Sequence, residues 1–291
     1  MKDKQPPPYP PPEPGSPRAW ERGGEGEGKI QAQGGREKGD RPLEAVLFDY
    51  GLTLIYFDEE PHAKLVGAYE QINHLLAKTL DRDVPAAEVL IDKISRAVDA
   101  DIQREYEAGR PEEVEIATIY DAALRRIGLE LEPELIEQIM ELEQRGWLNS
   151  VHVGPDVVPT LEAVHGLGLR LGLVSNAAYR PRLMMEQLEA VGLRSYFDAV
   201  TFSSEVGLRK PHPGIYTDAL KKLGVDARNV LFVGDRLRED VQGPQQLGMR
   251  AVLLREWSQE ADPGTADFVI HRLGELLPIV RQLRTGAPQT T

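Results

Sequence analysis

The 291-residue sequence contains no cysteine. Disulfide bonds, metal sites built on thiolates and catalysis by a cysteine nucleophile are therefore excluded. Long apolar runs are also missing, since no uninterrupted apolar segment approaches the roughly 18 residues that a membrane-spanning helix needs. The first residues, M-K-D-K-Q-P-P-P, lack the apolar stretch of a secretion signal. We therefore expect a soluble cytoplasmic protein with no membrane partner.

Positive charge is in deficit as well. The chain has 34 Lys and Arg against 47 Asp and Glu, a formal net charge of −13. Residues 1–42 carry 8 basic and 7 acidic side chains, a net of +1, which leaves the rest of the chain near −14. Nucleic acid is not expected as a partner, because binding its backbone requires a basic face. A phosphate site in this protein would need a local positive charge, most simply a metal ion and one lysine.

Residues 1–42 differ in composition from the rest of the chain. They contain 9 prolines, 8 glycines and few apolar side chains. Such a segment cannot bury enough apolar surface to offset the entropy lost on ordering. We predict a disordered arm over 1–42, with residues 6–12 (P-P-P-Y-P-P-P) in a polyproline II conformation. A solvated arm and a ligand for a proline-recognising partner are both compatible with it. Residues 286–291 are predicted to be a short tail.

The body of the chain changes its hydrophobic period twice. An apolar strand at 45–49 is followed by four runs with helical spacing, at 65–80, 89–102, 116–127 and 135–142. From residue 151 strands and helices alternate, with strands at 171–174, 230–233, 251–254 and 268–270 and helices near 181–191, 214–223, 241–247 and 273–283. Alternation predicts a parallel sheet covered by helices on both faces. We therefore predict an α/β fold: a Rossmann-like, doubly wound core (43–57 and 150–285) with an inserted four-helix unit (58–149).

The first predicted strand ends on a carboxylate, in the sequence A-V-L-F-D-Y-G-L-T. Asp49 closes the apolar run, and Gly51 and Thr53 follow in a predicted turn. In parallel sheets, ligands bind in the crevice beyond the carboxyl ends of the strands. Asp49 is therefore a candidate catalytic residue, although capping the turn would also explain it.

Polar residues follow the second strand and a later loop. Ser175 and Asn176 come directly after the strand, where they could cap the next helix or hold a phosphate oxygen. The surroundings of Ser175 lack the G-x-S-x-G pattern of a hydrolase nucleophile. Lys210, in G-L-R-K-P-H-P, is followed by two prolines that stiffen the chain, so its ammonium group can be directed with little further loss of entropy. An ordinary surface lysine is the alternative.

The third strand supplies two more carboxylates. It ends on Gly234 and Asp235, and Asp240 follows five residues later. These acids could cap a helix, or they could complete an oxygen-ligand site with Asp49. Mg²⁺ prefers such hard oxygen ligands and needs few protein carboxylates because it keeps several waters.

Together the four segments resemble the motifs of the haloacid dehalogenase superfamily, whose members are mostly phosphatases. The motifs occur in order as D-Y-G-L-T, V-S-N, G-L-R-K-P and G-D-x-x-x-x-D across about 44–270. The four-helix unit is similar to the cap that closes over the site in one branch of the superfamily. The resemblance implies a hydrolase of a small phosphorylated metabolite, without indicating which metabolite or which oligomeric state.

The resemblance also implies a role for each matching residue. The counterpart of Asp49 attacks phosphorus and becomes an aspartyl phosphate, and the counterparts of Ser175 and Lys210 hold the phosphoryl group. Thr53 and Asn176, which lie in the first two motifs, are assigned to substrate binding. Mg²⁺ would be bound by Asp49, Asp235 and the backbone carbonyl of Gly51, with Asp240 close by.

The sequence departs from this pattern at two positions of the first motif. Gly51 stands where phosphatases of the superfamily have a second aspartate, which protonates the leaving alcohol and later activates water, and Leu52 replaces the usual glycine. General acid–base catalysis typically contributes about 10²- to 10⁴-fold in rate. Three explanations are open: substrates with a good leaving group, replacement by another acid such as Asp58, Glu59 or His62, or a binding protein that has lost catalysis.

Two other activities of the superfamily rank lower. Dehalogenases carry a tyrosine two residues after the nucleophile, whereas Tyr50 is one residue after Asp49. Phosphonatases use a cap lysine as a Schiff base, and the sequence does not single out one among Lys64, Lys78 and Lys93. The Gly-Asp pair at 234–235 favours phosphate chemistry.

Overall fold

The computed structural model describes residues 42–258 and 264–285. The predicted disordered arm, its polyproline segment and the predicted C-terminal tail lie outside these residues, apart from Pro42. Across the two described ranges, no helix has both the length and the apolar character to cross a membrane.

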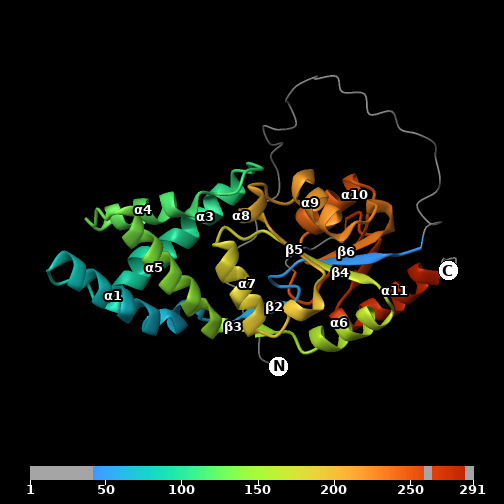
Figure 1. The fold of residues 1–291 in the computed structure, drawn as a ribbon, viewed down its shortest axis with the longest axis horizontal. Helices are drawn as coiled ribbons and strands as arrows, with labels where there is room; N and C mark the ends of the chain where they lie inside the picture. Colours follow the sequence, from blue (N-terminus) through green and yellow to red (C-terminus); the bar gives the residue numbers. More distant parts are fainter. Residues whose placement is uncertain (1–41, 259–263, 286–291) are drawn as a thin grey trace, which may run out of the picture.

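A six-stranded parallel sheet in the order β5-β4-β1-β6-β7-β8 forms the centre of the fold (Figure 1). Its strands are β1 (Ala45–Phe48), β4 (Arg170–Ser175), β5 (Ala199–Phe202), β6 (Val230–Gly234), β7 (Arg250–Leu254) and β8 (Phe268–Ile270). β1 pairs in parallel with β4 on one side and with β6 on the other. The strand order therefore reverses at β1, and in open α/β sheets the crevice at this reversal is the ligand site. The predicted fold class is confirmed.

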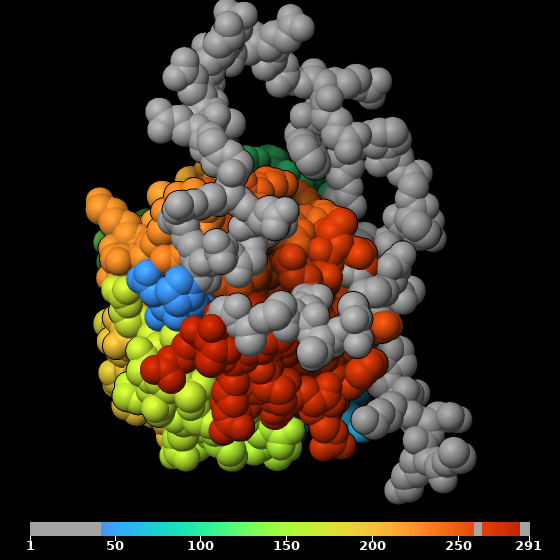
Figure 2. All heavy atoms as spheres, turned by 90° about the vertical axis from the view of Figure 1, so that its right-hand side faces the viewer, coloured from blue at the N-terminus to red at the C-terminus, as the bar shows by residue number. Residues whose placement is uncertain are grey.

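The central strand β1 is buried on both faces, which explains why it reads as a continuous apolar run. Val46 and Phe48 belong to an apolar cluster with residues of α6, α7 and α11, whereas Ala45 and Leu47 pack with residues of α9. The helices of the core are α6 (Val157–Gly166), α7 (Pro181–Ala190), α8 (Ser203–Val206), α9 (Pro213–Leu223), α10 (Gly243–Gln246) and α11 (Leu276–Thr285). Figure 2 shows α6 and α11 side by side at the end of the core opposite the inserted helices.

The inserted helices lie between β2 (Ile55–Phe57) and β3 (Val151–Val153), which pair with each other in antiparallel fashion. They are η2 (Pro61–Leu65), α1 (Val66–Leu80), α2 (Ala87–Leu90), η3 (Ile91–Ser95), α3 (Arg96–Glu107), α4 (Ile116–Arg126), α5 (Pro133–Gly146) and η4 (Trp147–Ser150). We call the elements from η2 to η4 the cap. The cap has its own apolar core, in which Tyr69, Ile94 and Tyr120 are fully buried. Helices occupy all four segments for which the spacing predicted them.

Several elements differ from the predicted ones. β5, α6 and the β2–β3 pair are absent from the sequence-based prediction. A polar residue, Thr201 or His152, interrupts the apolar run in β5 and β3, and α6 contains Pro159. The second cap helix is interrupted by η3, a π-helical turn. The helix predicted near 241–247 begins earlier, as the π-helical η7 (Leu237–Gln242), which continues into α10. π-turns inside helices are frequent at functional sites.

The turn after β1 contains a leucine in the left-handed region, since Leu52 has φ +59°. Its amide donates to the carbonyl oxygen of Ile55 at 2.7 Å, which holds the turn closed. A residue with a Cβ atom pays about 1–2 kcal/mol for this conformation. The glycine that the resemblance led us to expect here would adopt it freely.

Two substitutions at this position should separate backbone strain from packing. Leu52→Gly and Leu52→Ala remove the same side-chain contacts, but only glycine relieves the positive φ. We expect Leu52→Gly to have a free energy of unfolding about 1 kcal/mol higher than that of Leu52→Ala, measured by urea denaturation. An alanine variant as stable as the glycine variant would contradict the prediction that the positive φ at position 52 is strained.

Candidate active site

The site is built where the carboxyl ends of three neighbouring strands meet. Asp49 follows β1, and its amide donates to the carbonyl oxygen of Val233 in β6 at 2.9 Å. Ser175 ends β4, and Asp235 follows β6. All three residues are buried, with exposed fractions of 7% or less for the whole residue. The sheet thus brings together polar groups that are more than 180 residues apart in the chain.

Lys210 completes this group from the loop between α8 and α9. Its ammonium nitrogen donates to Asp49 Oδ1 at 2.6 Å and to Asp240 Oδ1 at 2.7 Å. The side chain of Lys210 is only 3% exposed. Burial opposes its positive charge, but the carboxylates of Asp240 and Asp49 outweigh burial and raise its pKa above the usual value. Lys210 is therefore held as a cation between two carboxylates.

Asn176 holds the backbone of Lys210. The Asn176 side-chain amide donates to the carbonyl oxygen of Lys210 at 3.1 Å, and the Lys210 amide donates to Asn176 Oδ1 at 2.7 Å. Both hydrogen-bonding groups of the asparagine are therefore used inside the protein. The observed contacts of Asn176 position the lysine, and its assignment to substrate binding stays a prediction.

Three carboxylates form a cluster that can hold a cation. One oxygen from each of Asp49, Asp235 and Asp240 lies within 4.8 Å of the other two. Burial, followed by the negative charges of Asp240 and Asp49, raises the pKa of Asp235 well above its usual value. Burial also raises the pKa of Asp240 to about 7, against the opposing effect of Lys210. Both shifts have the same causes, burial and the repulsion between neighbouring carboxylates.

Asp235 provides a direct test of whether a metal ion fits. Its Oδ1 atom is buried and has no hydrogen-bond partner among the described residues. A buried anionic oxygen without a partner is costly, unless a bound cation satisfies it. Three carboxylates around one point are the kind of donor set that Mg²⁺ prefers. The residues present therefore fit a magnesium ion.

Gly234 is required by the close approach of Asp240. A Cβ atom at Gly234 would overlap the carboxyl group of Asp240. The other oxygen of this carboxyl group, Oδ2, accepts from the amide of Arg236 at 3.0 Å, so the aspartate is fixed against its own turn. The Gly-Asp pair of the third strand thus has a packing reason as well as a chemical one.

Family comparison agrees with this geometry. The family model for haloacid dehalogenase-like hydrolases matches residues 43–248, which include every candidate site residue. The chain belongs to the haloacid dehalogenase-like hydrolase family. The match confirms the resemblance that the four motifs indicated.

Individual relatives within the haloacid dehalogenase-like family are named for different activities. The chain is similar to glyceraldehyde 3-phosphate phosphatase of Methanopyrus kandleri, with 31% identity over 83% of this chain and 98% of that protein. It is 29% identical to phosphoglycolate phosphatase of Yersinia pseudotuberculosis, over 56% of this chain and 72% of that protein. Among solved structures it is similar to a phosphatase from Thermococcus onnurineus (TM-score 0.55, 27% identity) and to a 2-haloacid dehalogenase from Pseudomonas syringae (TM-score 0.57, 26% identity), each match covering 82% of this chain and 98% of the other.

Gly51, which replaces the aspartate of the family's phosphatases, lies beside open space. A Cβ atom built on Gly51 meets no atom within 4 Å, and its backbone is outside the left-handed region. A side chain at this position is therefore sterically allowed. No other described residue fills the space that a Cβ atom at position 51 would occupy.

The three candidate replacement acids differ in their surroundings. Asp58 Oδ1 is 2.8 Å from the ring nitrogen of His152, and His62 Nε2 is 2.9 Å from Asp99 Oδ2. Glu59 is exposed. Asp58 is thus held by a histidine, and His62 is held by an aspartate.

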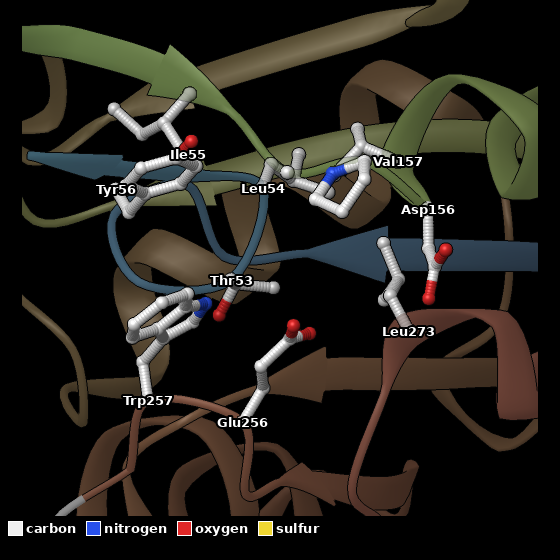
Figure 3. A pocket seen from close by; sticks show the side chains of 11 residues that line it. Thr53, Leu54, Ile55, Tyr56, Asp156, Val157, Glu256, Trp257 and Leu273 are labelled. Atoms are coloured by element: carbon white, nitrogen blue, oxygen red, sulfur yellow. The ribbon is translucent and has the colours of Figure 1, made fainter. Parts of the chain in front are cut away.

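Thr53 lies on another side of the turn after β1. It lines a small pocket with Trp257 and Glu256, and this pocket is not lined by Asp49 or Lys210 (Figure 3). The hydroxyl oxygen of Thr53 is buried and has no hydrogen-bond partner among the described residues. Its assignment to substrate binding stays a prediction.

Arg236 and Arg209 belong to the site region but were not predicted from the sequence. Burial disfavours the charge of Arg236, yet Asp235, Glu239 and other nearby acids raise its pKa, so it adds positive charge beside the cluster. Arg209 is 4% exposed and precedes Lys210. The only sequence signal for either arginine is that it adjoins a motif residue.

The charge excess in the cluster predicts how magnesium changes stability. In magnesium-free buffer, Asp235→Asn should unfold at the same temperature as the unsubstituted protein or a higher one, because burial and the neighbouring acids already disfavour the charged form of Asp235. Addition of Mg²⁺ should raise the unfolding temperature of the unsubstituted protein, since a ligand that binds the folded state stabilises it. Differential scanning calorimetry with and without EDTA measures both effects.

Leu52→Ala provides the matched control, because it lies in the same region without removing a carboxylate. It should keep the rise in unfolding temperature that magnesium produces. An equal rise in Asp235→Asn would show that the ion binds elsewhere.

Proposed function

We propose that this protein is a Mg²⁺-dependent phosphatase that acts on small phosphorylated metabolites through an aspartyl phosphate at Asp49. The observation that carries the proposal is the buried ammonium group of Lys210 between Asp49 and Asp240, beside the unpartnered oxygen of Asp235. The relatives by sequence that are named as phosphatases support phosphate as the substrate class.

The proposed reaction has two steps at Asp49. A carboxylate oxygen of Asp49 attacks phosphorus, and the bond from phosphorus to the leaving oxygen breaks as the new bond forms. Water then cleaves the aspartyl phosphate, which releases phosphate and restores the carboxylate. Lys210 orients Asp49 and attracts the substrate's negative charge, and Ser175 is placed to bind a phosphoryl oxygen at the end of β4.

An anionic nucleophile must approach an anionic substrate in this site. Mg²⁺ held by Asp49, Asp235 and the carbonyl oxygen of Gly51, with Asp240 close by, would neutralise charge on the phosphoryl oxygens. Without that neutralisation, two unit charges about 4 Å apart repel by about 4 kcal/mol at an effective dielectric constant of 20. Lys210 and Arg236 together carry two positive charges against the three carboxylates, so the chain's own charges reduce this repulsion without removing it.

Gly51 narrows the range of substrates. No aspartate stands two residues after the nucleophile to protonate the leaving oxygen. A leaving group that is stable as an anion, such as a carboxylate or an anomeric or aryl oxygen, needs little protonation. We therefore infer that acyl, aryl or anomeric phosphates are better substrates than alkyl phosphates.

Dehalogenation ranks below phosphate hydrolysis for this site. A dehalogenase-named structure is among the similar folds, so the fold alone does not separate the two activities. The cluster of three buried carboxylates favours phosphate, because it needs a cation that dehalogenation of a haloacid does not require.

Replacement of the nucleophile tests the reaction. Asp49→Asn should lower the hydrolysis of p-nitrophenyl phosphate and acetyl phosphate by at least about 10³-fold, since an amide oxygen is a poor nucleophile. Release of inorganic phosphate with and without Mg²⁺ provides the measurement. Hydrolysis at an unchanged rate by Asp49→Asn would overturn the assignment.

Beryllium fluoride, which mimics a phosphoryl group on a carboxylate, separates an enzyme from a binding protein that has lost catalysis. A stable adduct on Asp49 together with turnover supports the enzyme. An adduct without turnover of any activated phosphate would indicate a binding protein that retains the old site.

Restoration of the missing acid tests the inference about leaving groups. Gly51→Asp should raise kcat/KM for an alkyl phosphate about 100- to 1000-fold, the lower part of the range typical for a general acid, and should raise kcat/KM for acetyl phosphate much less. Gly51→Asn is the matched control, because it has the same shape but donates no carboxyl proton. Equal rates for the two variants on the alkyl phosphate would show that a missing proton donor at position 51 does not limit the reaction.

A further inference from the structure

One segment of the cap is fastened to the core directly beside Lys210. We call residues 105–113 the docking segment; it runs from the last turn of α3 toward α4, next to α8 (Figure 1). Glu112 forms an isolated antiparallel bridge with Leu208, and the amide of Glu113 donates to the carbonyl oxygen of Gly207 at 3.0 Å. The docking segment therefore lies along the loop that carries Lys210.

Arg209 makes most of the side-chain contacts in this docking. Its guanidinium group donates to the backbone carbonyl oxygens of Glu105 at 3.3 Å and of Glu112 at 3.0 Å, and also to that of Arg110. It lies 4.1 Å from the ring centre of Tyr106, a distance suited to a cation–π contact. The carbonyl of Glu105 is among the last four of α3, which lack partners within the helix and attract positive charge. An arginine of the core thus provides a hydrogen-bond partner for a C-terminal carbonyl oxygen of α3, a helix of the cap.

The backbone around Arg209 is held from two sides at consecutive residues. The amide of Arg209 donates to the carbonyl oxygen of Pro111 in the docking segment at 2.8 Å. The next amide, that of Lys210, donates to Asn176 Oδ1 at 2.7 Å. The direction in which the lysine side chain leaves the backbone therefore depends on the cap on one side and on Asn176 on the other.

A second chain of contacts joins the docking segment to Ala177, the residue that follows Asn176. Glu113 accepts a hydrogen bond from the hydroxyl group of Ser203, and it also accepts one from the hydroxyl of Tyr106 at 3.2 Å. The oxygen of Ser203 accepts from the amide of Ala177 at 2.7 Å. Since Ala177 follows Asn176, the contacts of the cap reach the neighbour of each partner of the Asn176–Lys210 pair, Arg209 directly and Ala177 through Ser203.

We propose that Arg209 is a positioning residue that couples docking of the cap to the placement of Lys210. In the docked state its contacts hold the 209–210 backbone so that the ammonium group of Lys210 lies between Asp49 and Asp240. The coupling deepens the proposed phosphatase function and rests on it. A displacement of about 1 Å at a group that positions a substrate can cost about 100-fold in rate.

A double-mutant cycle on the full chain tests the coupling. Binding of inorganic phosphate in the presence of Mg²⁺ is measured by titration calorimetry for Arg209→Lys, in the unsubstituted background and in Lys210→Met. The variant keeps the charge but cannot contact three carbonyl oxygens at once. We expect about 10-fold weaker binding in the unsubstituted background and a change below 2-fold in Lys210→Met, because residues that act through one another are not additive.

Arg110→Gln is the matched control, because Arg110 lies in the same docking segment with a side chain that is 65% exposed and pairs with Glu105. Its phosphate affinity should stay within 2-fold of the unsubstituted value. Equal weakening by Arg209→Lys in both backgrounds, or none in either, would overturn the coupling. If Arg209→Lys does not fold, Glu113→Gln takes its place in the same cycle, with the same two criteria.

Hydrogen exchange separates failure of the coupling from failure of the proposed function. Absence of phosphate binding by the unsubstituted protein would overturn the function. The coupling is then decided by amide exchange in Arg209→Lys: faster exchange at 105–113 together with Lys210 and Ala177 supports it, and faster exchange confined to 105–113 overturns it. Thermal unfolding of each variant shows that the chain is folded during these measurements.

Discussion

The site depends on how one ammonium group is shared among buried carboxylates. Lys210 donates to Asp49 and to Asp240 at 2.6 and 2.7 Å, and no hydrogen bond from a described residue reaches Oδ1 of Asp235. Removing such charges from water costs several kcal/mol for each ion, and attraction offsets this only where each charge has a partner. The arrangement is therefore incomplete in charge without a cation, and the unpartnered oxygen marks where the deficit lies.

The topology of the sheet explains how these groups meet. β1 is flanked by β4 and β6, so the first residues beyond the three strands come to one edge although they are far apart in the chain. The sequence predicted this part well, because an apolar run that ends abruptly on Asp49 or on Gly234 and Asp235 is visible without coordinates. Lys210 was also identifiable, since two prolines follow it. β5 was not, because the polar Thr201 interrupts its apolar run of four residues.

Other features of the site were hidden from the sequence for a different reason. Asn176 holds the backbone of Lys210, and Arg209 contacts backbone carbonyl oxygens about 100 residues away. A carbonyl oxygen is present at every residue, so nothing in the composition of the docking segment indicates that it will accept these bonds. The positive φ of Leu52 is similarly invisible, because the residue that occupies the position disfavours the conformation that it adopts.

The charge deficit and the docking of the cap are connected by the same lysine. Interactions among Lys210, Asp49 and Asp240 are strong only where water is excluded, because the effective dielectric constant falls with burial. The docking segment of the cap is bonded to the residue before Lys210. In the coupling that we propose, loss of this bond would release one of the two restraints on the 209–210 backbone. Docking of the cap and alignment of the buried ammonium group are thus favoured by the same set of contacts.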